Sequence, residues 1–236
     1  MKNHWDDIAE IRKYQIENHK DITFSKLFLP YFINIISSHH HDSILEIGCG
    51  TGHMAKHIIE CTSPKVYVGI ENSKKMFSIA KETNSSNYAS IIQTSIFEYN
   101  SSHTYDIIIS HLCLHAIDNI ELLFDKVLTL LNKRGIFIFS IPHPCFFHEY
   151  KNIFDNFEYK KISKTFFNLS ITNDPQKMPS IPYIHRPLEF YIKSILQKKL
   201  LLVDFDENFP QQNIMHLYKT SFTKPHYATF ICQKNN

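Results

Sequence analysis

The sequence predicts an α/β fold in which parallel strands alternate with crossover helices. From residue 43 onward, short β-rich runs alternate with helical stretches, which is the pattern of parallel strands joined by helices. Two of these runs, Ile107-Ile108-Ile109 and Ile136-Phe137-Ile138-Phe139, are continuously apolar, as expected for strands that are covered on both faces of a sheet. With 236 residues, 43% of them hydrophobic, the chain is long enough for one such domain with insertions.

Two helices are predicted before the sheet. Apolar side chains recur at helical spacing from Trp5 to Ile16 behind two aspartates, which predicts an amphipathic helix over residues 5–18. In the next apolar segment, Pro30 separates two groups of apolar residues, so we expect either a break or a helix that begins at the proline. Residues 1–40 are thereby expected to form a helical cap.

The core elements follow in a regular order. The β-rich runs predict strands at residues 43–47, 66–70, 88–93, 105–110 and 134–141. The helical stretches predict helices near residues 52–61, 73–83 and 119–131. Gly135 stands before the last apolar run and is expected to supply the turn from the preceding helix.

Residues 142–182 interrupt this rhythm with five prolines and many aromatic residues. A structureless loop of this length is unusual inside a compact domain, so we interpret the segment as a lid or small insertion. A packed subdomain that touches no ligand is the alternative. Beyond it, the patterns predict a helix from residue 188, a strand at 200–203 and a last strand at 227–232.

Composition limits the classes of partner and compartment. The 25 basic and 23 acidic residues give a net charge of +2, so the overall charge does not favour nucleic acid as a partner. Five cysteines without a Cys-x-x-Cys pair argue against a disulfide framework or zinc ribbon, and the triplet His39-His40-His41 lacks companion ligands, so no metal is expected. No apolar run approaches the roughly 18 residues of a membrane span, and the acidic N-terminus does not read as a secretory signal. We expect a soluble cytoplasmic protein.

The strongest functional signal is an apolar strand that runs into three alternating glycines and then a helix. Gly48, Gly50 and Gly52 allow positive φ angles and let a ligand touch the main chain, while the helix N-terminus offers free N–H groups. Glu71 follows the last glycine by 19 residues at the end of the next β-rich run, where a carboxylate can accept hydrogen bonds from ribose hydroxyls. This succession predicts a site for a nucleoside cofactor.

The chain resembles the class I S-adenosylmethionine-dependent methyltransferases in the segment ILEIGCGTG and in the later VGIE. The resemblance implies a Rossmann-like three-layer sandwich, with a seven-stranded, mostly parallel sheet whose last strand is antiparallel. It implies one methyltransferase domain over residues 1–236, with S-adenosylmethionine as the cofactor and S-adenosylhomocysteine as the product. It also implies a set of cofactor-binding residues: Glu46, Gly48, Cys49, Gly50, Gly52, Glu71, Asn72, Ser95, Ile96 and Ser110.

One position departs from the family pattern. Where many members carry an aspartate that holds the adenine amino group, this chain has Ser95, whose hydroxyl can hydrogen-bond but carries no charge. Ile96 is expected to flank the adenine ring. The departure leaves open a cofactor-binding partner subunit without catalysis.

A nicotinamide-dependent oxidoreductase is the chief rival, because a glycine loop and a ribose-binding acid serve both classes. The dinucleotide fingerprint requires Gly-x-Gly-x-x-Gly, whereas His53 occupies the position of its third glycine here. The spacing therefore favours the methyltransferase.

Two histidines are predicted as catalytic residues. His111 lies near the tip of the fourth strand, where sulfonium and acceptor meet in the family that the chain resembles. His143 lies between Pro142 and Pro144, whose φ angles are fixed, and histidine titrates near neutrality, so this side chain can take a proton from the acceptor. A chain turn in which His143 only binds a carbonyl is weighed equally.

The acceptor-binding residues are predicted on two segments. His115 follows the fourth strand in a Leu-His pattern that also serves packing, and the later His-Arg-Pro-Leu segment resembles one that closes the pocket in a subgroup of small-molecule methyltransferases. We therefore expect Tyr183, His185 and Arg186 to orient a polar or anionic acceptor. An ion pair of Arg186 with Glu189 that caps the helix is the alternative.

The predicted reaction is methyl transfer to an oxygen or nitrogen of a small, partly aromatic metabolite by a monomer or homodimer. The segment after the fourth strand lacks the Asn/Asp-Pro-Pro-Tyr/Phe sequence of nucleobase methyltransferases, which disfavours nucleobases. A protein or RNA methyltransferase is a further alternative.

Overall fold

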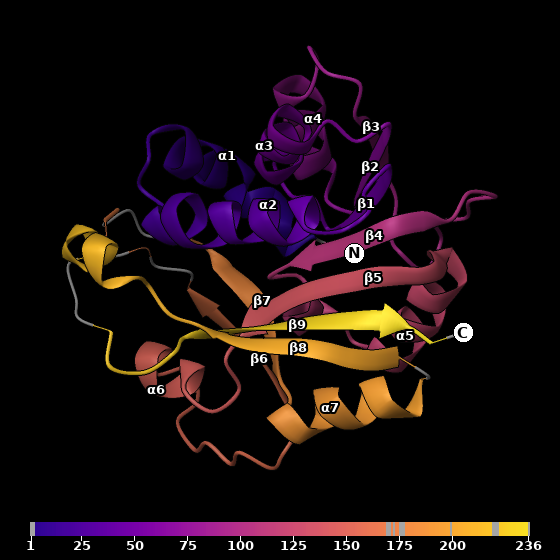
Figure 1. Cartoon of the computed structure of the whole chain (residues 1–236). Coiled ribbons are helices and arrows are strands. Elements are labelled where there is room, and N and C mark those ends of the chain that lie inside the picture. The colour runs from indigo at the N-terminus through magenta and orange to yellow at the C-terminus, as the bar shows by residue number, and fades with distance from the viewer. Residues whose placement is uncertain are drawn as a thin grey trace.

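A seven-stranded sheet forms the centre of the molecule, with the strand order β3-β2-β1-β4-β5-β9-β8 (Figure 1). The computed structural model describes residues 3–168, 171, 173–174, 178–198, 200–218 and 222–235. The sheet consists of β1 (Ser43–Ile47), β2 (Val66–Glu71), β3 (Ser90–Gln93), β4 (Tyr105–His111), β5 (Leu131–Pro142), β8 (Leu200–Asn208) and β9 (Tyr227–Lys234). Strands β1 to β5 are parallel, and β9 runs antiparallel to both β5 and β8. The predicted fold class is confirmed, including the antiparallel last strand.

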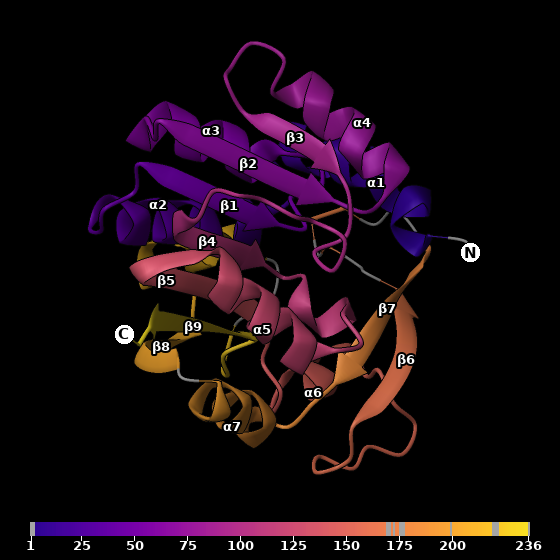
Figure 2. The ribbon, with the colours of Figure 1, turned by 90° about the vertical axis from the view of Figure 1, so that its right-hand side faces the viewer.

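Helices cover both faces of this sheet (Figure 2). One face packs against α2 (Leu29–Ser37) and α3 (His53–Thr62), and the other packs against α5 (Ile120–Leu130) and α7 (Leu188–Gln197). Alternate residues of each central strand enter the two cores, so Ile107 and Ile109 face α2 and α3 while Ile108 faces α5. Each fully buried side chain of this size stabilises the fold by roughly 1.5–3 kcal/mol.

The predicted core helices are present, and two of them begin at side-chain caps. In α4 (Lys74–Thr83) the Ser73 side chain accepts a hydrogen bond from the Met76 N–H, and in α5 the Asn119 side chain accepts one from Leu122. Such caps satisfy N–H groups that the helix itself leaves unpaired. None of the helices in the described part of the chain has the length and hydropathy of a membrane span.

The predicted turn at Gly135 is wrong. Strand β5 begins directly after α5 at Leu131, and Arg134 is the residue with a positive φ of 61°. Gly135 lies inside the strand, where an added Cβ would come within 3.0 Å of the carbonyl oxygens of Tyr105 and Asn132. The glycine therefore allows a close backbone approach both to β4 and to Asn132, at the point where the pairing of β4 and β5 is irregular.

The N-terminal segment begins with α1 (His4–Glu17). A π-helical segment, η1 (Thr23–Phe28), then continues into α2, whose first turn contains Pro30. A proline is tolerated there because the first N–H groups of a helix have no intrahelical partner. Asp6 of α1 accepts hydrogen bonds from the Ser73 hydroxyl at 2.6 Å and the Lys75 N–H at 2.9 Å, which fastens α1 to the start of α4.

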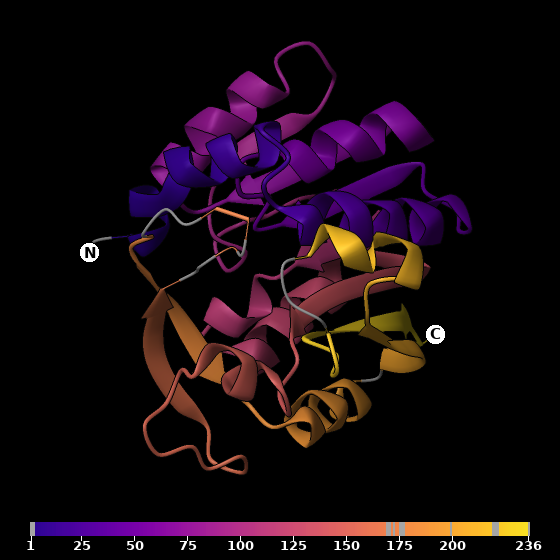
Figure 3. The ribbon, with the colours of Figure 1, turned by 90° about the vertical axis from the view of Figure 1, so that its left-hand side faces the viewer.

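The segment 142–182 contains a short helix, α6 (Phe147–Lys151), and β6 (Ser163–Asn168), which pairs with β7 (Ser180–His185) in a separate antiparallel sheet. Residues 169–170, 172 and 175–177, including the proline at 175, lie outside the described residues. Helix α1 and the β6–β7 hairpin lie at the same end of the large sheet (Figures 2 and 3). They share a small apolar core in which Ile8 of α1 packs with Phe167 and Ile181.

Candidate active site

The glycine loop, residues 48–52, connects β1 to α3 and has an unusual backbone. Gly48, Gly50 and Gly52 all have positive φ angles, of 70°, 54° and 76°. Side chains other than glycine rarely adopt this region, which explains the alternating glycines. The N–H groups of Gly48 and Cys49 both donate to the Ile70 carbonyl, at 2.9 and 3.0 Å, and fix the loop to β2. A Cβ on Gly50 would meet no atom within 4 Å, so the main chain is open to a ligand at that point.

Glu71 at the end of β2 joins this loop to the segment before α4. Its Oε2 accepts a hydrogen bond from the Gly50 N–H at 2.9 Å, and its Oε1 accepts one from the Ser73 N–H at 2.7 Å. Burial raises the pKa of Glu71 above the ordinary value, while these backbone N–H groups oppose the shift. Each carboxylate oxygen can accept more than one hydrogen bond, so both remain capable of binding hydroxyls.

A cavity of about 850 Å³ extends from the glycine loop across the carboxyl ends of the central strands. This volume lies within the roughly 300–1,000 Å³ of typical small-molecule sites. Ten residues predicted from the sequence line it: Glu46, Gly48, Cys49, Gly50, Glu71, Asn72, Ser95, Ile96, His111 and His115. Six predicted residues do not: Gly52, Ser110, His143, Tyr183, His185 and Arg186.

Gly52 and Ser110 support the loop from behind. A Cβ on Gly52 would lie 2.5 Å from the Asn84 side-chain nitrogen and 2.9 Å from Ala80, so this glycine permits the contact between α3 and α4. The Ser110 hydroxyl is fully buried and donates to the Ile47 carbonyl at 3.0 Å, which ties β4 to β1. Both residues hold the glycine loop in place without facing the cavity.

Glu46 and Ser95 face the same end of the cavity as the glycine loop. Burial raises the pKa of Glu46 to about 7, and the Tyr67 hydroxyl donates to its carboxylate at 2.8 Å. Ser95 donates to the Glu98 carboxylate at 3.1 Å, and the neighbouring Ile96 is buried. These residues, the glycine loop, Glu71 and Asn72 define what we term the cofactor half of the cavity.

The remaining lining of the cavity, which we term the acceptor half, includes many aromatic and apolar side chains. Several of them had no signal in the sequence that connects them to the glycine loop: Trp5, Phe24, Phe147, Phe166, Phe167 and Tyr227. Trp5 is the single tryptophan of the chain and lies in the first turn of α1. Packing of the cap and the insertion against the strand ends brings these side chains together with Tyr227 of β9, so spacing along the chain does not reveal them.

His111 ends β4 at the boundary of the two halves. Its Nδ1 and the Ser140 hydroxyl are 2.8 Å apart, and its ring lies 4.4 Å from the Phe28 ring centroid. Burial lowers the pKa of His111 to about 3, so the imidazole is neutral. The next residue, Leu112, has a positive φ of 46°, a strained conformation for a branched side chain. This strain lies at the place where β4 gives way to the acceptor half.

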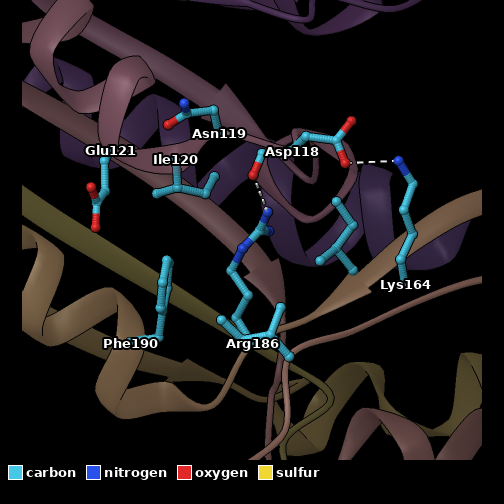
Figure 4. A pocket seen from close by; sticks show the side chains of 9 residues that line it. Asp118, Asn119, Ile120, Glu121, Lys164, Arg186 and Phe190 are labelled. Atoms are coloured by element: carbon cyan, nitrogen blue, oxygen red, sulfur yellow. Dashed lines mark hydrogen bonds and ion pairs between the residues drawn. The ribbon is translucent and has the colours of Figure 1, made fainter.

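Arg186 binds the backbone carbonyls of the acceptor turn, residues 112–119. The guanidinium is buried and donates to the carbonyls of Ile117 at 2.5 Å, Asp118 at 3.0 Å and Leu114 at 3.4 Å. Figure 4 shows the guanidinium directed at the backbone of Asp118, in a second cavity of about 450 Å³. Arg186 thus positions the turn that carries His115 and does not line the larger cavity.

The helix-capping alternative for Arg186 is not what the structure shows. Glu189 makes its ion pairs with Lys160 at 2.8 Å and with Lys193 at 3.4 Å. The Arg186 guanidinium instead lies 5.6 Å from the centre of the Phe190 ring.

His143 is placed away from the cavity, contrary to the expectation for a general base. Its Nε2 lies 2.8 Å from Glu207 Oε1, its Nδ1 accepts from the Cys145 N–H at 3.2 Å, and its ring stacks on Phe146. The side chain is 1% exposed. Because both nitrogens are engaged, the placement agrees with a structural role at a chain turn, but the partners are the Glu207 carboxylate and the Cys145 N–H and not the carbonyl of that alternative.

Tyr183 and His185 also lie outside the cavity wall. Tyr183 is buried between the rings of Phe147 and Phe167, at centroid distances of 5.6 and 5.8 Å. His185 donates through Nε2 to the Tyr159 carbonyl at 2.8 Å. Both side chains support the insertion.

Over residues 38–215 the sequence matches a family described as a methyltransferase domain. The chain belongs to this methyltransferase family. Membership confirms the predicted family, and with the fold it confirms S-adenosylmethionine as the cofactor of this methyltransferase domain. The open backbone at Gly50 and the Glu71 carboxylate at the cavity wall fit a nucleoside cofactor of this kind.

Two curated relatives of this methyltransferase are malonyl-[acyl-carrier protein] O-methyltransferases. The protein from Priestia megaterium is 24% identical over 155 residues, which cover 62% of this chain and 56% of the relative. The protein from Halalkalibacterium halodurans is 26% identical over 118 residues, which cover 48% of this chain and 43% of the relative. The chain therefore spans about half the length of the curated relatives it matches.

Solved structures share the methyltransferase fold. An S-adenosylmethionine-dependent methyltransferase from Clostridium acetobutylicum has a TM-score of 0.67 at 17% identity, covering 99% of this chain and 100% of that one. The N-methyltransferase NodS from Bradyrhizobium japonicum, in complex with S-adenosylhomocysteine, has a TM-score of 0.60 at 12% identity. The match covers 98% of this chain and 100% of that one. At these identities the likeness concerns the fold.

Proposed function

We propose that this chain transfers a methyl group from S-adenosylmethionine to an oxygen or nitrogen of a small, uncharged, partly aromatic metabolite. One observation carries the proposal: the cavity of about 850 Å³ continues from the glycine loop into the aromatic acceptor half. A cavity of this form can hold donor and acceptor side by side, as alignment for in-line attack requires.

In the cofactor half, the proposed roles follow from the contacts of each residue. Glu71 accepts hydrogen bonds from the ribose hydroxyls while it retains the Gly50 N–H, and Ile96 packs against the adenine ring. Ser95 and Asn72 offer neutral polar atoms at the cavity wall. S-adenosylmethionine, when bound, supplies a sulfonium whose methyl group is already activated for transfer.

The charges of the acceptor half support an uncharged acceptor. Arg12 lines this half and pairs with Asp21 at 2.7 Å, and Lys164 pairs with Asp118 at 2.7 Å (Figure 4). Both cations are therefore already paired with a carboxylate, which weakens their attraction for an anionic acceptor. A malonyl carboxylate, which the names of the curated relatives imply, is therefore less well matched than a neutral ring.

His111 is the proposed catalytic residue. Its neutral imidazole stands at the tip of β4. In the tautomer whose Nδ1–H donates to the Ser140 hydroxyl oxygen, Nε2 is the acceptor nitrogen that remains for the substrate. A pKa of about 3 makes the ring a weak base. We therefore assign it the task of accepting a hydrogen bond from the acceptor O–H or N–H, while the proton passes to solvent.

The first test is binding, followed by turnover. Calorimetry should detect binding of both S-adenosylmethionine and S-adenosylhomocysteine. The absence of binding at high micromolar concentration would contradict the proposal. The protein is then incubated with methyl-labelled cofactor, a metabolite extract, and separately a protein and RNA extract. Label in one small molecule supports the proposal. Label in macromolecules supports the protein or RNA alternative, and binding without any labelled product supports a non-catalytic partner subunit.

A further inference from the structure

His115 is a buried polar side chain without a hydrogen-bond partner. It is 5% exposed, lines the acceptor half, and its Nδ1 is enclosed with no partner among the described residues. Buried polar side chains are normally hydrogen-bonded, and leaving one unpaired lowers stability. The Nε2 atom of the same ring likewise has no hydrogen-bond partner among the described residues, but it is not enclosed, so a molecule bound in the cavity can supply its partner.

The ring of His115 is held in a fixed environment. The Trp5 ring meets it edge-on at 6.4 Å, and the Tyr183 ring lies 5.8 Å away. Arg186 fixes the turn on either side of the ring through the carbonyls of Leu114 and Ile117. The imidazole therefore cannot readily swing to a protein partner.

The chemistry of the ring limits what it can recognise. Burial lowers the pKa of His115 to about 3, with a further contribution from the Arg186 charge, so the imidazole is neutral. A neutral imidazole has one N–H donor and one acceptor nitrogen. Since Nδ1 is enclosed, Nε2 is the nitrogen that a bound molecule can reach.

We infer that His115 is a specificity-determining residue that hydrogen-bonds, through Nε2, a polar atom of the acceptor other than the methylated one. The inference rests on the proposed function and deepens it. His111 lies against Phe28, whereas His115 lies against Trp5 and Tyr183, so the two imidazoles address different parts of a bound molecule. The substrate class is thereby an uncharged aromatic or heteroaromatic ring with two hydrogen-bonding atoms.

The experiment uses phenol and toluene as probes, because they have the same shape and differ in one hydroxyl. Binding to the protein saturated with S-adenosylhomocysteine is followed by the fluorescence of Trp5, which lines the same half. The phenol-to-toluene affinity ratio is compared between variants, so that the greater hydrophobicity of toluene cancels. We expect this ratio to fall about tenfold in His115→Phe, which keeps a ring and removes the hydrogen bond.

Two amide variants identify the nitrogen. Glutamine places its amide near the position of Nε2, and asparagine places its amide near Nδ1. We expect His115→Gln to retain the wild-type ratio within about threefold and His115→Asn to behave like His115→Phe. The matched control is His57→Phe on α3. The His57 side chain is 40% exposed, and this variant should leave the phenol-to-toluene ratio unchanged.

The outcomes separate this inference from the proposed function. An unchanged ratio in His115→Phe, or no measurable phenol binding to the wild type, overturns the inference, and wild-type behaviour of the asparagine variant overturns the assignment to Nε2. Calorimetry with S-adenosylhomocysteine on each variant checks that the fold is intact. Failure of the wild type to bind S-adenosylhomocysteine would instead overturn the proposed function.

Discussion

The carboxylate of Glu71 accepts a hydrogen bond from the Gly50 N–H at 2.9 Å, and this contact links the ends of β2 and β1 at the floor of the cavity. The same carboxylate accepts the Ser73 N–H, so one side chain fixes the glycine loop and the start of α4 together. Under the proposed function, recognition of the cofactor and the shape of its site therefore depend on the same two oxygen atoms.

Replacing Glu71 should weaken cofactor binding strongly. Glu71→Gln keeps the size of the side chain but presents an amide NH₂ to one of two backbone donors, and hydrogen bonds to charged groups contribute about 1.5–3 kcal/mol each. We expect a loss of about 10- to 100-fold in S-adenosylmethionine affinity, measured by calorimetry. Glu60→Gln, on an exposed carboxylate of α3, is the control. Equal affinities in the two variants would contradict the role of Glu71.

Alanine at two positions of the glycine loop should have different effects. Gly50→Ala places a Cβ in open space, where the bound cofactor is expected to contact the main chain. Gly48→Ala instead places the Cβ 2.5 Å from Cys113 Sγ. Both carry about 1–2 kcal/mol of backbone strain at positive φ. We expect Gly50→Ala to lose cofactor affinity with a small change in melting temperature, and Gly48→Ala to lose more stability. Thermal unfolding combined with calorimetry distinguishes them, and identical profiles would argue against an open site at Gly50.

Arg186→Lys should damage the acceptor side alone. A lysine cannot reproduce the planar set of donors that meets three carbonyls, and an unsatisfied buried acceptor costs about 1–3 kcal/mol. We expect lower stability by that amount and a raised acceptor KM, while the affinity for S-adenosylhomocysteine stays within about twofold of the wild type. Arg134→Lys, on an exposed side chain, should change none of these. A loss of cofactor affinity in Arg186→Lys would show that the two halves are not separable.

The pH dependence of stability should reveal the buried His115. Its pKa is about 3 in the folded chain and near 6.5 when unfolded, so below pH 6.5 the unfolded chain binds more protons. The stability that His115 contributes is therefore present above pH 6.5 and is lost as the pH falls toward 3. As the pH falls from 6 to 4, the free energy of unfolding of His115→Phe should therefore rise relative to that of the wild type by about 1.4 kcal/mol per pH unit.

Denaturant unfolding at several pH values measures this difference in unfolding free energy between His115→Phe and the wild type. His57→Phe, at a side chain that is 40% exposed, is measured alongside as a histidine-to-phenylalanine control. A difference between His115→Phe and the wild type that does not change with pH would mean that His115 is protonated equally in both states.

The features predicted well from the sequence are those set by local spacing. Gly48, Gly50 and Glu71 occupy the ends of adjacent parallel strands, so a short motif fixes where they meet. Trp5 and Phe166 reach the same cavity through packing of the cap and the insertion, which no periodicity encodes. His143 shows the converse: two flanking prolines suggested a rigid catalytic position, but the ring turned to Glu207 and Phe146.

Gly135 illustrates a second limit. A glycine before a strand is consistent with either a left-handed turn or a close backbone approach, and sequence does not distinguish them. The deciding contact is with the Tyr105 carbonyl on a neighbouring strand, 30 positions earlier in the chain. Long-range contacts of this kind become visible only once the strands are paired.

The contact between Gly48 and Cys113 has a consequence for how the family can diverge. A Cβ at position 48 would lie only 2.5 Å from the Cys113 sulfur, so a side chain there would force one of the two residues to shift. A bulkier residue at 113 would press on the donor loop, so drift in the acceptor turn is constrained by a residue that never meets the acceptor. New specificities on this scaffold are therefore expected to arise from α1 and the β6–β7 hairpin, whose side chains are free of that restriction.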